Sequence, residues 1–320
     1  MDRAKQKINR IAQALATAWV VTACALLPAC STGIESTRKV TLSKEDKQRI
    51  EPSPDDTFLP AQPGDSLPAW QPGKQFMAAD NRTALIFSQA GLPVSTDSLA
   101  LKGKTITYRR AGISTRPDER DEIVVEFNLD GMTLLYPTAK YPTEAAEIIS
   151  SDIPMLIDLD MVGKVSRQLV GKQLWTRTGL WYAPNGDIVP GRKFVSVTID
   201  SVNPGDIAFP IYISFHDDRG ARGMMMMSYS RRMAQSRPFS SLFSLSDPRK
   251  QYESISDEKW KCIQEGRVIP YMTKEECRLS LGNPTAVDTG HDYNKTIDVW
   301  QYGDGRFLYF EDGLLQRFKL

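Results

Sequence analysis

The chain opens with a charged segment followed by a long apolar run. Basic side chains recur over residues 1–10, and residues 11–29 then run almost without charge. This order is typical of a secretory signal sequence. The apolar run is also about long enough to cross a bilayer once, so an uncleaved membrane anchor is the alternative. The pattern predicts an exported chain whose signal occupies residues 1–30.

The next segment, residues 31–75, is polar and shows no sustained hydrophobic period. It carries prolines that interrupt any helix, namely Pro52, Pro54, Pro60, Pro63, Pro68 and Pro72. Such a composition is typical of an extended tether. We therefore expect this segment to hold the folded part away from a membrane.

Residues 76–235 alternate short apolar runs with turn clusters. The runs are rich in β-branched and aromatic residues, as in 105–108, 123–127 and 194–199, and predict strands. The methionine run Met224–Met227 predicts a core strand in preference to a copper site, because a strand points successive side chains to opposite faces. The Ser-, Arg- and Pro-rich stretch 231–250 then predicts a linker.

This middle region contains a weak internal echo. Leu101-Lys102-Gly103-Lys104 precedes one block of three strands, and Leu169-Val170-Gly171-Lys172 precedes another. The echo suggests two similar small β units separated by a helix near Thr143 to Ser150, although chance spacing explains it equally simply.

The C-terminal region, residues 254–320, carries two helix signals followed by three strand signals. Ser254 can cap a helix that ends at Gly266, and Thr273 opens a capping box whose helix ends at Gly282. Three strands separated by tight turns are then expected over 296–302, 306–310 and 314–318. The sequence thus predicts an α+β fold, with a β-rich middle region and a C-terminal α-α-β-β-β module.

Two cysteines near the end of the apolar run bear on how the chain is anchored. Small residues precede both, as Ala23-Cys24 and Ala29-Cys30, and this resembles the bacterial lipobox, whose cysteine is acylated. We favour Cys30 as the acylated residue because polar sequence begins directly after it, and Cys24 is the alternative. The simplest other explanation is that neither cysteine is acylated and both are ordinary apolar positions of a signal or anchor. The residue after Cys30 is not Asp, as in lipoproteins sent to the outer membrane, so we expect a lipid-anchored outer-membrane protein.

Composition narrows the function classes. The 320 residues are 41% hydrophobic, and 40 Lys and Arg face 39 Asp and Glu, which gives a net charge of +1. No excess field exists to gather phosphates, so nucleic acid is not an expected partner. Only two histidines occur, which leaves few candidates for metal ligation or acid–base catalysis. We therefore expect no metal, no cofactor and no enzymatic activity.

Two short motifs offer catalytic alternatives. Asp288-Thr289-Gly290 matches the aspartic-protease triplet, but that chemistry needs two such aspartates and the motif predicts a turn. His216-Asp217-Asp218 closes an expected strand and could serve a hydrolase, although no nucleophile motif accompanies it. An envelope hydrolase built on His216 remains the enzymatic alternative.

The C-terminal region carries a family resemblance. It rests on an ordered set of short motifs: Gly266-Arg267-Val268, Met272-Thr273-Lys274-Glu275-Glu276, Leu281-Gly282-Asn283-Pro284, Trp300-Gln301-Tyr302 and Phe310-Glu311-Asp312-Gly313. The set resembles the SmpA/OmlA family, small outer-membrane lipoproteins that accompany the β-barrel assembly machine. The resemblance covers about residues 254–320 and implies a non-enzymatic scaffolding or binding module. It is also similar to a β-lactamase inhibitor fold, so inhibition of an envelope enzyme is a further alternative.

Five C-terminal residues are candidates for specific roles. Cys262 and Cys277 fall one in each predicted helix, and an exported chain meets oxidising conditions, so they predict a disulfide; two buried free thiols are the alternative. The aromatic residues Trp300, Tyr302 and Tyr309 lie on predicted strands and are candidates for a partner surface. Envelope proteins of unknown identity, and a membrane reached through the lipid anchor, are the expected partners.

Overall fold

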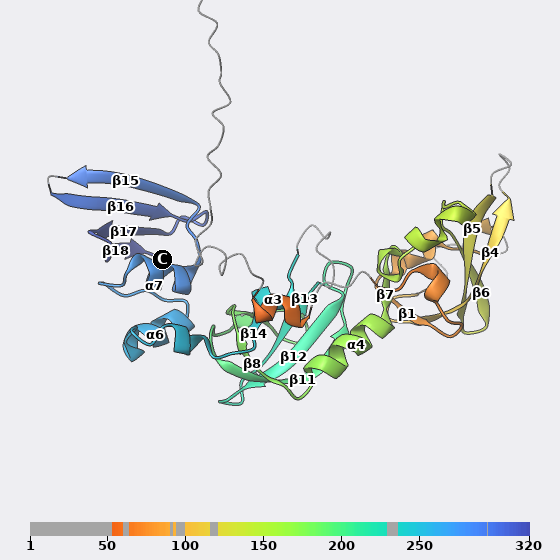
Figure 1. The fold of residues 1–320 in the computed structure, drawn as a ribbon, viewed down its shortest axis with the longest axis horizontal. Helices are drawn as coiled ribbons and strands as arrows, with labels where there is room; N and C mark the ends of the chain where they lie inside the picture. Colours follow the sequence, from red (N-terminus) through yellow and green to blue (C-terminus); the bar gives the residue numbers. More distant parts are fainter. Residues whose placement is uncertain are drawn as a thin grey trace, which may run out of the picture. The chain divides into compact units, whose positions relative to one another are not determined.

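The computed structural model describes residues 53–59, 64–89, 92–93, 100–115, 121–228, 236–292 and 294–320. Within these ranges the chain is a strand-rich α/β protein with three antiparallel sheets, which confirms the predicted mixed class at this coarse level (Figure 1). None of the helices in the described part of the chain has the length and apolar character needed to span a bilayer.

The first sheet has the strand order β3-β2-β6-β5-β4-β1-β7. Its strands are β1 (Gln75–Ala78), β2 (Ser88–Gln89), β3 (Leu92–Pro93), β4 (Thr105–Thr115), β5 (Asp121–Leu129), β6 (Met132–Pro137) and β7 (Leu156–Asp158). Short 3-10 helices connect them: η1 (Leu67–Ala69), η2 (Asn81–Ile86), η4 (Pro142–Glu147) and η5 (Ser150–Asp152). Every second residue of β5 is buried, so the alternation in its sequence places one face on the core.

The second sheet has the order β10-β9-β13-β12-β11-β8-β14. The helix α4 (Leu159–Leu169) precedes its strands, which are β8 (Gln173–Thr176), β9 (Leu180–Tyr182), β10 (Ile188–Pro190), β11 (Ser196–Pro204), β12 (Ile211–Asp217), β13 (Arg222–Met227) and β14 (Phe243–Ser244). The short helices α3 (Pro54–Phe58), α5 (Phe239–Leu242) and η6 (Pro248–Gln251) complete this region.

The two sheets repeat the same arrangement of strands. Adding seven to each strand number of the first order reproduces the second order. Each sheet also has a β-bulge in its longest strand, after Tyr108 in β4 and after Ile199 in β11. In each, the residue before the bulge donates its amide to a lysine carbonyl, from Tyr108 to Lys74 and from Ile199 to Lys172.

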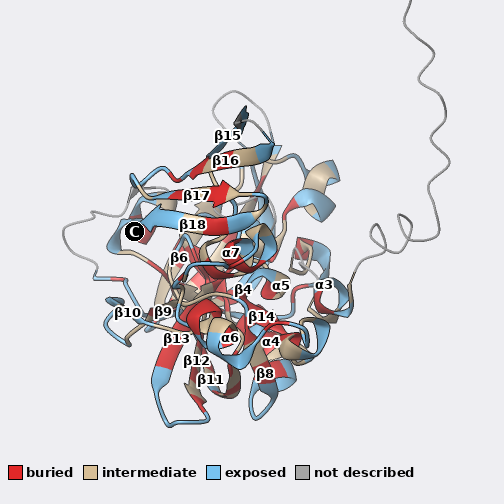
Figure 2. Ribbon diagram, turned by 90° about the vertical axis from the view of Figure 1, so that its left-hand side faces the viewer, coloured by how far each residue is buried: buried red, intermediate tan, exposed pale blue. Residues whose placement is uncertain are grey.

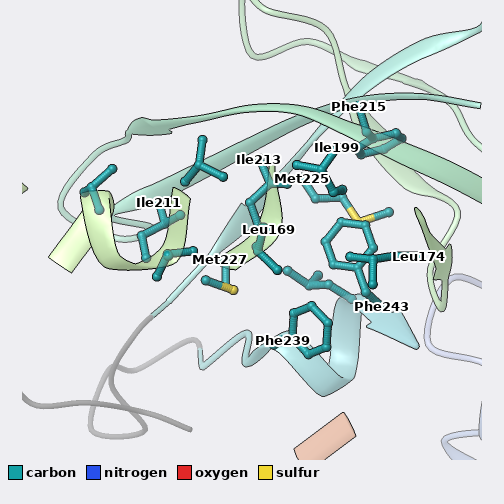
Figure 3. Packing of buried hydrophobic residues seen from close by; sticks show 14 of the residues in the cluster. Leu169, Leu174, Ile199, Ile211, Ile213, Phe215, Met225, Met227, Phe239 and Phe243 are labelled. Carbon is teal, nitrogen blue, oxygen red and sulfur yellow. The ribbon is translucent and has the colours of Figure 1, made fainter. Parts of the chain in front are cut away.

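The core of the second sheet is formed by α4 and the strands it covers. Leu169 of α4 packs with Met227 of β13 and with Phe239 and Phe243, as Figure 3 shows. Met225 and Met227 are 0% and 1% exposed, so the methionine run lies in a core strand as predicted. Burying each such side chain contributes about 1.5–3 kcal/mol.

The C-terminal region contains two helices and one sheet. The helices are α6 (Asp257–Gln264) and α7 (Lys274–Leu281), and the strands, in sheet order, are β15 (Ala286–Asp292), β16 (Lys295–Gln301), β17 (Phe307–Glu311) and β18 (Leu314–Lys319). The capping box at Thr273 is present, and Gly282 has the positive φ expected at the helix end. Ser256, and not Ser254, caps α6, because its hydroxyl accepts the amide of Lys259. In Figure 2, β17 has buried stretches while β18 is mostly exposed.

Several predicted boundaries are corrected. The C-terminal sheet has a further strand, β15, where the Asp288-Thr289-Gly290 motif had predicted a turn; it pairs along its length with β16. The helix expected near Thr143 to Ser150 is the six-residue 3-10 helix η4, which has Pro142 at its first position and ends at Glu147 after about two turns. The helix between the two sheets is instead α4.

Parts of the predicted tether and of the predicted linker are folded. The helix α3 packs against the second sheet, where Asp55 accepts hydrogen bonds from Arg177 and from the amide of Leu245, and Phe58 contacts Phe239 with ring centroids 5.1 Å apart. The strand β14 falls within the stretch predicted as linker. Apolar side chains at Phe58, Phe239 and Phe243 outweigh the local Pro and Ser signals by burial in a shared core.

Candidate binding site on the first sheet

The predicted lipidation sites, Cys30 and its alternative Cys24, lie outside the described residues. The acylation hypothesis therefore stays a prediction from the sequence. The remaining predicted residues all lie in described parts of the chain, in the second sheet and the C-terminal region.

The thiols of Cys262 and Cys277 are free and buried, so the predicted disulfide is absent from this structure. Both side chains belong to the apolar core between α6, α7 and the C-terminal sheet. Burial raises the pKa of the Cys277 thiol to about 12, and the charge of Glu276 adds to the effect. A thiol held in its neutral form is a poor nucleophile for disulfide exchange, so these cysteines act as small apolar core residues.

Two of the three aromatic residues assigned to a partner surface are core residues instead. Trp300 is 1% exposed and Tyr302 is 7% exposed, since the helices cover the sheet face that carries them. The Tyr302 hydroxyl donates to the carbonyl of Gly282 over 3.2 Å, and burial raises its pKa to about 12. Tyr309 points to the opposite face, where the guanidinium of Arg317 lies 4.7 Å from its ring centre. Only Tyr309 remains available to a partner.

The histidine motif does not assemble a hydrolytic site. His216 Nδ1 lies 2.7 Å from Asp200 Oδ1 on the surface of the second sheet. Asp217 is buried and turns away from His216 to pair with Arg192 and to accept the amides of Arg219 and Ala221. Among the described residues no hydroxyl or thiol is hydrogen-bonded to His216. His216 and Asp217 do not act together because neighbouring residues of the strand β12 point to opposite faces of the sheet.

A cluster of charges around a buried lysine lies where β1 meets β7 and α4. Lys74 Nζ contacts Asp158 at 3.0 Å, Asp160 at 2.8 Å and Asp65 at 3.3 Å, and its side chain is 3% exposed. Ser150 donates a hydroxyl hydrogen bond to Asp158. Desolvation opposes the charged form of Lys74, but its hydrogen bonds to Asp160 and Asp158 raise its pKa overall. Lys74 and Asp158 are closed to solvent, while the side chains of Asp65 and Asp160 are partly exposed. The cluster therefore joins structural elements around a buried ion pair.

The described surface is hollowed beside β4 of the first sheet. A hollow of about 510 Å³ lies between η1, η4 and the outer half of β4. Its lining is mostly apolar and comes from Leu67, Pro68, Trp70, Pro72, Tyr108, Ile123, Pro142 and Ala145, with Arg109 to Ile113 along one side. We call it the inner hollow, because Ile123 and Tyr108 share the core face of the sheet.

A second hollow lies on the other face of the same strands. It has a volume of about 730 Å³ and is lined by η2, β2, β5 and β6 together with Arg110 to Ser114 of β4. We call it the outer hollow; its lining mixes apolar side chains, such as Leu85 and Leu135, with the carboxylates of Glu122 and Glu126. Glu126 pairs with Arg109 at 3.1 Å and with Arg110 at 2.7 Å. Residues 110–113 of β4 therefore border a hollow on each face.

In the second sheet a helix covers the equivalent strand, β11. There α4 lies against β11, and its buried residues Met161, Val162 and Val165 share a core with Val202 (Figure 1). Val202 stands three residues after Ile199, as Ala111 stands three residues after Tyr108. Val202 is 8% exposed, whereas Ala111 is exposed. The short η1 in place of an eleven-residue helix leaves the inner hollow open.

Sequence reasoning missed this site, although one signal points to it. The equivalent turns of the two sheets read Gly73-Lys74-Gln75 and Gly171-Lys172-Gln173. The predicted echo paired Leu101-Lys102-Gly103-Lys104 with the second of these turns, and so aligned β4 with β8 when β4 corresponds to β11. Alignment on the Gly-Lys-Gln triplets would have shown that only the second unit has a helix directly before its triplet.

Comparisons with known proteins add no assignment: no protein-family model matches the chain, no curated protein matches its sequence and no solved structure matches its fold. The resemblance of residues 254–320 to the SmpA/OmlA family therefore stays a prediction.

Proposed function

We propose that this chain is a lipid-anchored protein of the bacterial outer membrane that acts as a structural or protein-binding component of the cell envelope. The charged and apolar leader and the acylatable Cys30, with Cys24 as the alternative, support the anchor. The near-neutral charge argues against a nucleic-acid partner.

One observation carries the binding role. The inner hollow is open, mostly apolar and preformed, and it lies where the second sheet is closed by α4. Binding sites for other molecules are concave and largely apolar, with a few polar groups at their edge. The inner hollow meets this description, with Arg109 and Arg110 at its border. His216, in contrast, lies on an open surface with Asp200 as its hydrogen-bonding partner.

We further propose that residues 254–320 form an SmpA/OmlA-like module. Two short capped helices followed by an antiparallel sheet support this proposal, as do the capping box at Thr273 and the positive φ of Gly282. The additional strand β15 departs from the expected α-α-β-β-β order. The module would present Tyr309 and the exposed face of β17 to other envelope proteins.

The anchor is tested by labelling cells with radioactive palmitate. The wild type and Cys24→Ala should incorporate label and fractionate with the outer membrane, whereas Cys30→Ala should do neither. Label in Cys30→Ala that is lost in Cys24→Ala would transfer the anchor to the alternative cysteine. An unlabelled wild type in the soluble fraction would refute the envelope assignment.

The binding role is tested by co-purification from solubilised membranes. Ala145→Trp places an indole in the inner hollow, and Ala221→Trp places the same group on an exposed turn of the second sheet. We expect the wild type and Ala221→Trp to retain an envelope protein that Ala145→Trp loses. Equal recovery with both variants would show that the inner hollow is not the binding site. Recovery of a single envelope enzyme, in a stoichiometric ratio to this chain, would favour inhibition of that enzyme over a scaffolding role.

A further inference from the structure

Among the described strands, the outer half of β4 is an edge of the first sheet. On one side β4 pairs with β5 along residues 107–115. On the other side β1 pairs only with residues 105–107, and Tyr108 makes the last hydrogen bonds, to Lys74 and Gly73. No described strand pairs with β4 beyond Tyr108 on that side. The residues from Arg109 to Thr115 are all exposed.

The direction of the backbone groups follows from the neighbouring strand. The amide of Ile123 donates to the carbonyl of Lys140, and the amide of Thr138 donates to the carbonyl of Ile123, so Ile123 directs both groups toward β6. Antiparallel strands alternate the direction of these groups from one residue to the next. Since Ile113 is opposite Ile123, the amide and carbonyl of Ile113 point to the open edge.

The same alternation applies along the edge. Ala111 and Thr115 share the orientation of Ile113, while Gly112 and Ser114 direct their backbone groups to β5. The Ala111 amide is already engaged by the phenol oxygen of Tyr108. Burial raises the pKa of Tyr108, and the hydrogen bond from this amide partly offsets the increase. The backbone groups of Ile113 and Thr115 and the carbonyl of Ala111 therefore form a hydrogen-bonding row suited to one more strand.

Both hollows flank this row. An added strand would turn alternate side chains to opposite faces, into the inner hollow and the outer hollow in turn. The inner hollow is mostly apolar, and Ile113 is 64% exposed at its border, so the strand should present apolar groups there. The outer hollow contains Glu122 and Glu126 and suits polar side chains. Arg109 and Arg110 share the single carboxylate Glu126, which favours an acidic residue at the strand's end.

We propose that β4 binds an extended segment of a partner protein as an additional strand, with residues 111–115 as the pairing edge. The partner segment alternates apolar and polar residues, and its apolar side chains occupy the inner hollow. This is strand addition to an exposed sheet edge, in which backbone hydrogen bonds supply affinity and side-chain pockets supply selectivity. The proposal rests on the proposed binding function and specifies its partner as an unfolded or extended polypeptide.

The test uses the full chain in detergent and a blocked nonapeptide in which Val alternates with Thr and each end carries an Asp. A fluorescent label on the peptide reports binding by anisotropy. Two further peptides carry N-methyl groups, one on the amides of the Val set and one on those of the Thr set. Only one set can face β4, so we expect one methylated peptide to bind about tenfold more weakly and the other to bind like the parent.

Protein variants identify the edge. Ile113→Pro removes an amide that points outward and leaves the β5 pairing intact, so we expect about tenfold weaker binding. Ile113→Ala keeps the amide and should lose less than about threefold. Circular dichroism checks that both variants keep the wild-type fold.

Three outcomes would overturn the proposal. These are no binding of the parent peptide, equal weakening by both methylation patterns, and wild-type affinity in Ile113→Pro. A dimer in light scattering that Ile113→Pro dissociates would assign the edge to a second copy and also overturn it. Because the purified chain is used, failure here leaves the anchor and the co-purification result to stand or fall by their own tests.

Discussion

The two seven-stranded sheets of this protein have the same strand order but differ in what covers them. Each has a bulge at the same place in its longest strand, and each begins at a Gly-Lys-Gln turn, at Gly73 and at Gly171. The second sheet is covered by α4, and the first by the three-residue η1. The two sheets therefore have the same strand order although different helices cover them. The covering helix decides whether the strand edge beside it is accessible.

The equivalent lysines of the two turns, Lys74 and Lys172, have different surroundings although the backbone arrangement around them is the same. Lys74 is buried among Asp65, Asp158 and Asp160, whereas Lys172 is exposed and lies 5.6 Å from the ring centre of Phe58. Desolvating a charge is costly unless it is paired, so Lys74 requires its partners and Lys172 does not. The following experiments substitute equivalent residues of the two sheets and compare the effects on stability.

The largest effect is expected at the lysine pair. Lys74→Met leaves the buried carboxylate of Asp158 without its ammonium partner, which should lower the free energy of unfolding by about 3–5 kcal/mol. Lys172→Met, the matched control, should change it by less than about 0.5 kcal/mol. Urea unfolding followed by circular dichroism measures both. Similar losses for the two variants would contradict the contrast in burial.

The second test compares the turns that follow β12 and β5. Asp217 is buried against Arg192, and Asp217→Asn should cost about 2–3 kcal/mol. Asp130→Asn, at the exposed turn of the first sheet, keeps a residue type that tolerates the positive φ there and should cost less than about 0.5 kcal/mol. Thermal unfolding at matched pH reports the difference. An equal change in both turns would show that Asp217 contributes nothing specific to the second sheet.

Asp217 also predicts a dependence on pH. Desolvation opposes its charged form, but the hydrogen bond from Arg192 and the amides of Ala221 and Arg219 lower its pKa overall. The stabilisation is therefore complete above the ordinary value of 3.8 and is lost as pH falls through the lower folded value. Acid titration of Asp217→Asn should lose less stability over this range than the wild type, and parallel titration curves would refute the assignment.

A smaller effect is expected in the loops before β4 and β11. Lys193 inserts its ammonium at the end of α7, where it donates to the carbonyls of Leu279 and Ser280, whereas Lys102 is exposed. Lys193→Ala leaves these acceptors without their donor and should cost about 1–2 kcal/mol. Lys102→Ala should be neutral. Proteolysis of the C-terminal region should be faster than in the wild type in Lys193→Ala alone. An unchanged rate in this variant would show that Lys193 does not stabilise the end of α7.

The smallest effect tests the residue at the open edge. Ala111→Val introduces the side chain that the second sheet has at Val202, and a β-branched residue favours a strand. We expect a gain of about 0.5 kcal/mol, read from the urea midpoint. Val202→Ala, in contrast, should cost about 1–2 kcal/mol because it leaves a space beneath α4. A loss in Ala111→Val would show that the inner hollow does not accommodate added volume.

The sequence by itself determined features that depend on short-range pattern. Alternation located β4, β5, β11 and the methionine strand, and capping residues located α7 at Thr273, because these signals act within a few residues. The leader and the cysteines at Cys24 and Cys30 are likewise read from local order, and the structure does not describe them.

Only the tertiary structure decided how those pieces are used. It placed Trp300 and Tyr302 in a core, kept Cys262 and Cys277 as free thiols and separated His216 from any described hydroxyl or thiol partner. It also left the outer half of β4 without a partner among the described strands on one side. Burial and edge pairing depend on contacts between residues far apart in the chain, so the pattern around any one residue cannot specify them. The hollow beside this edge is open because the short helix η1 stands where the second sheet has α4.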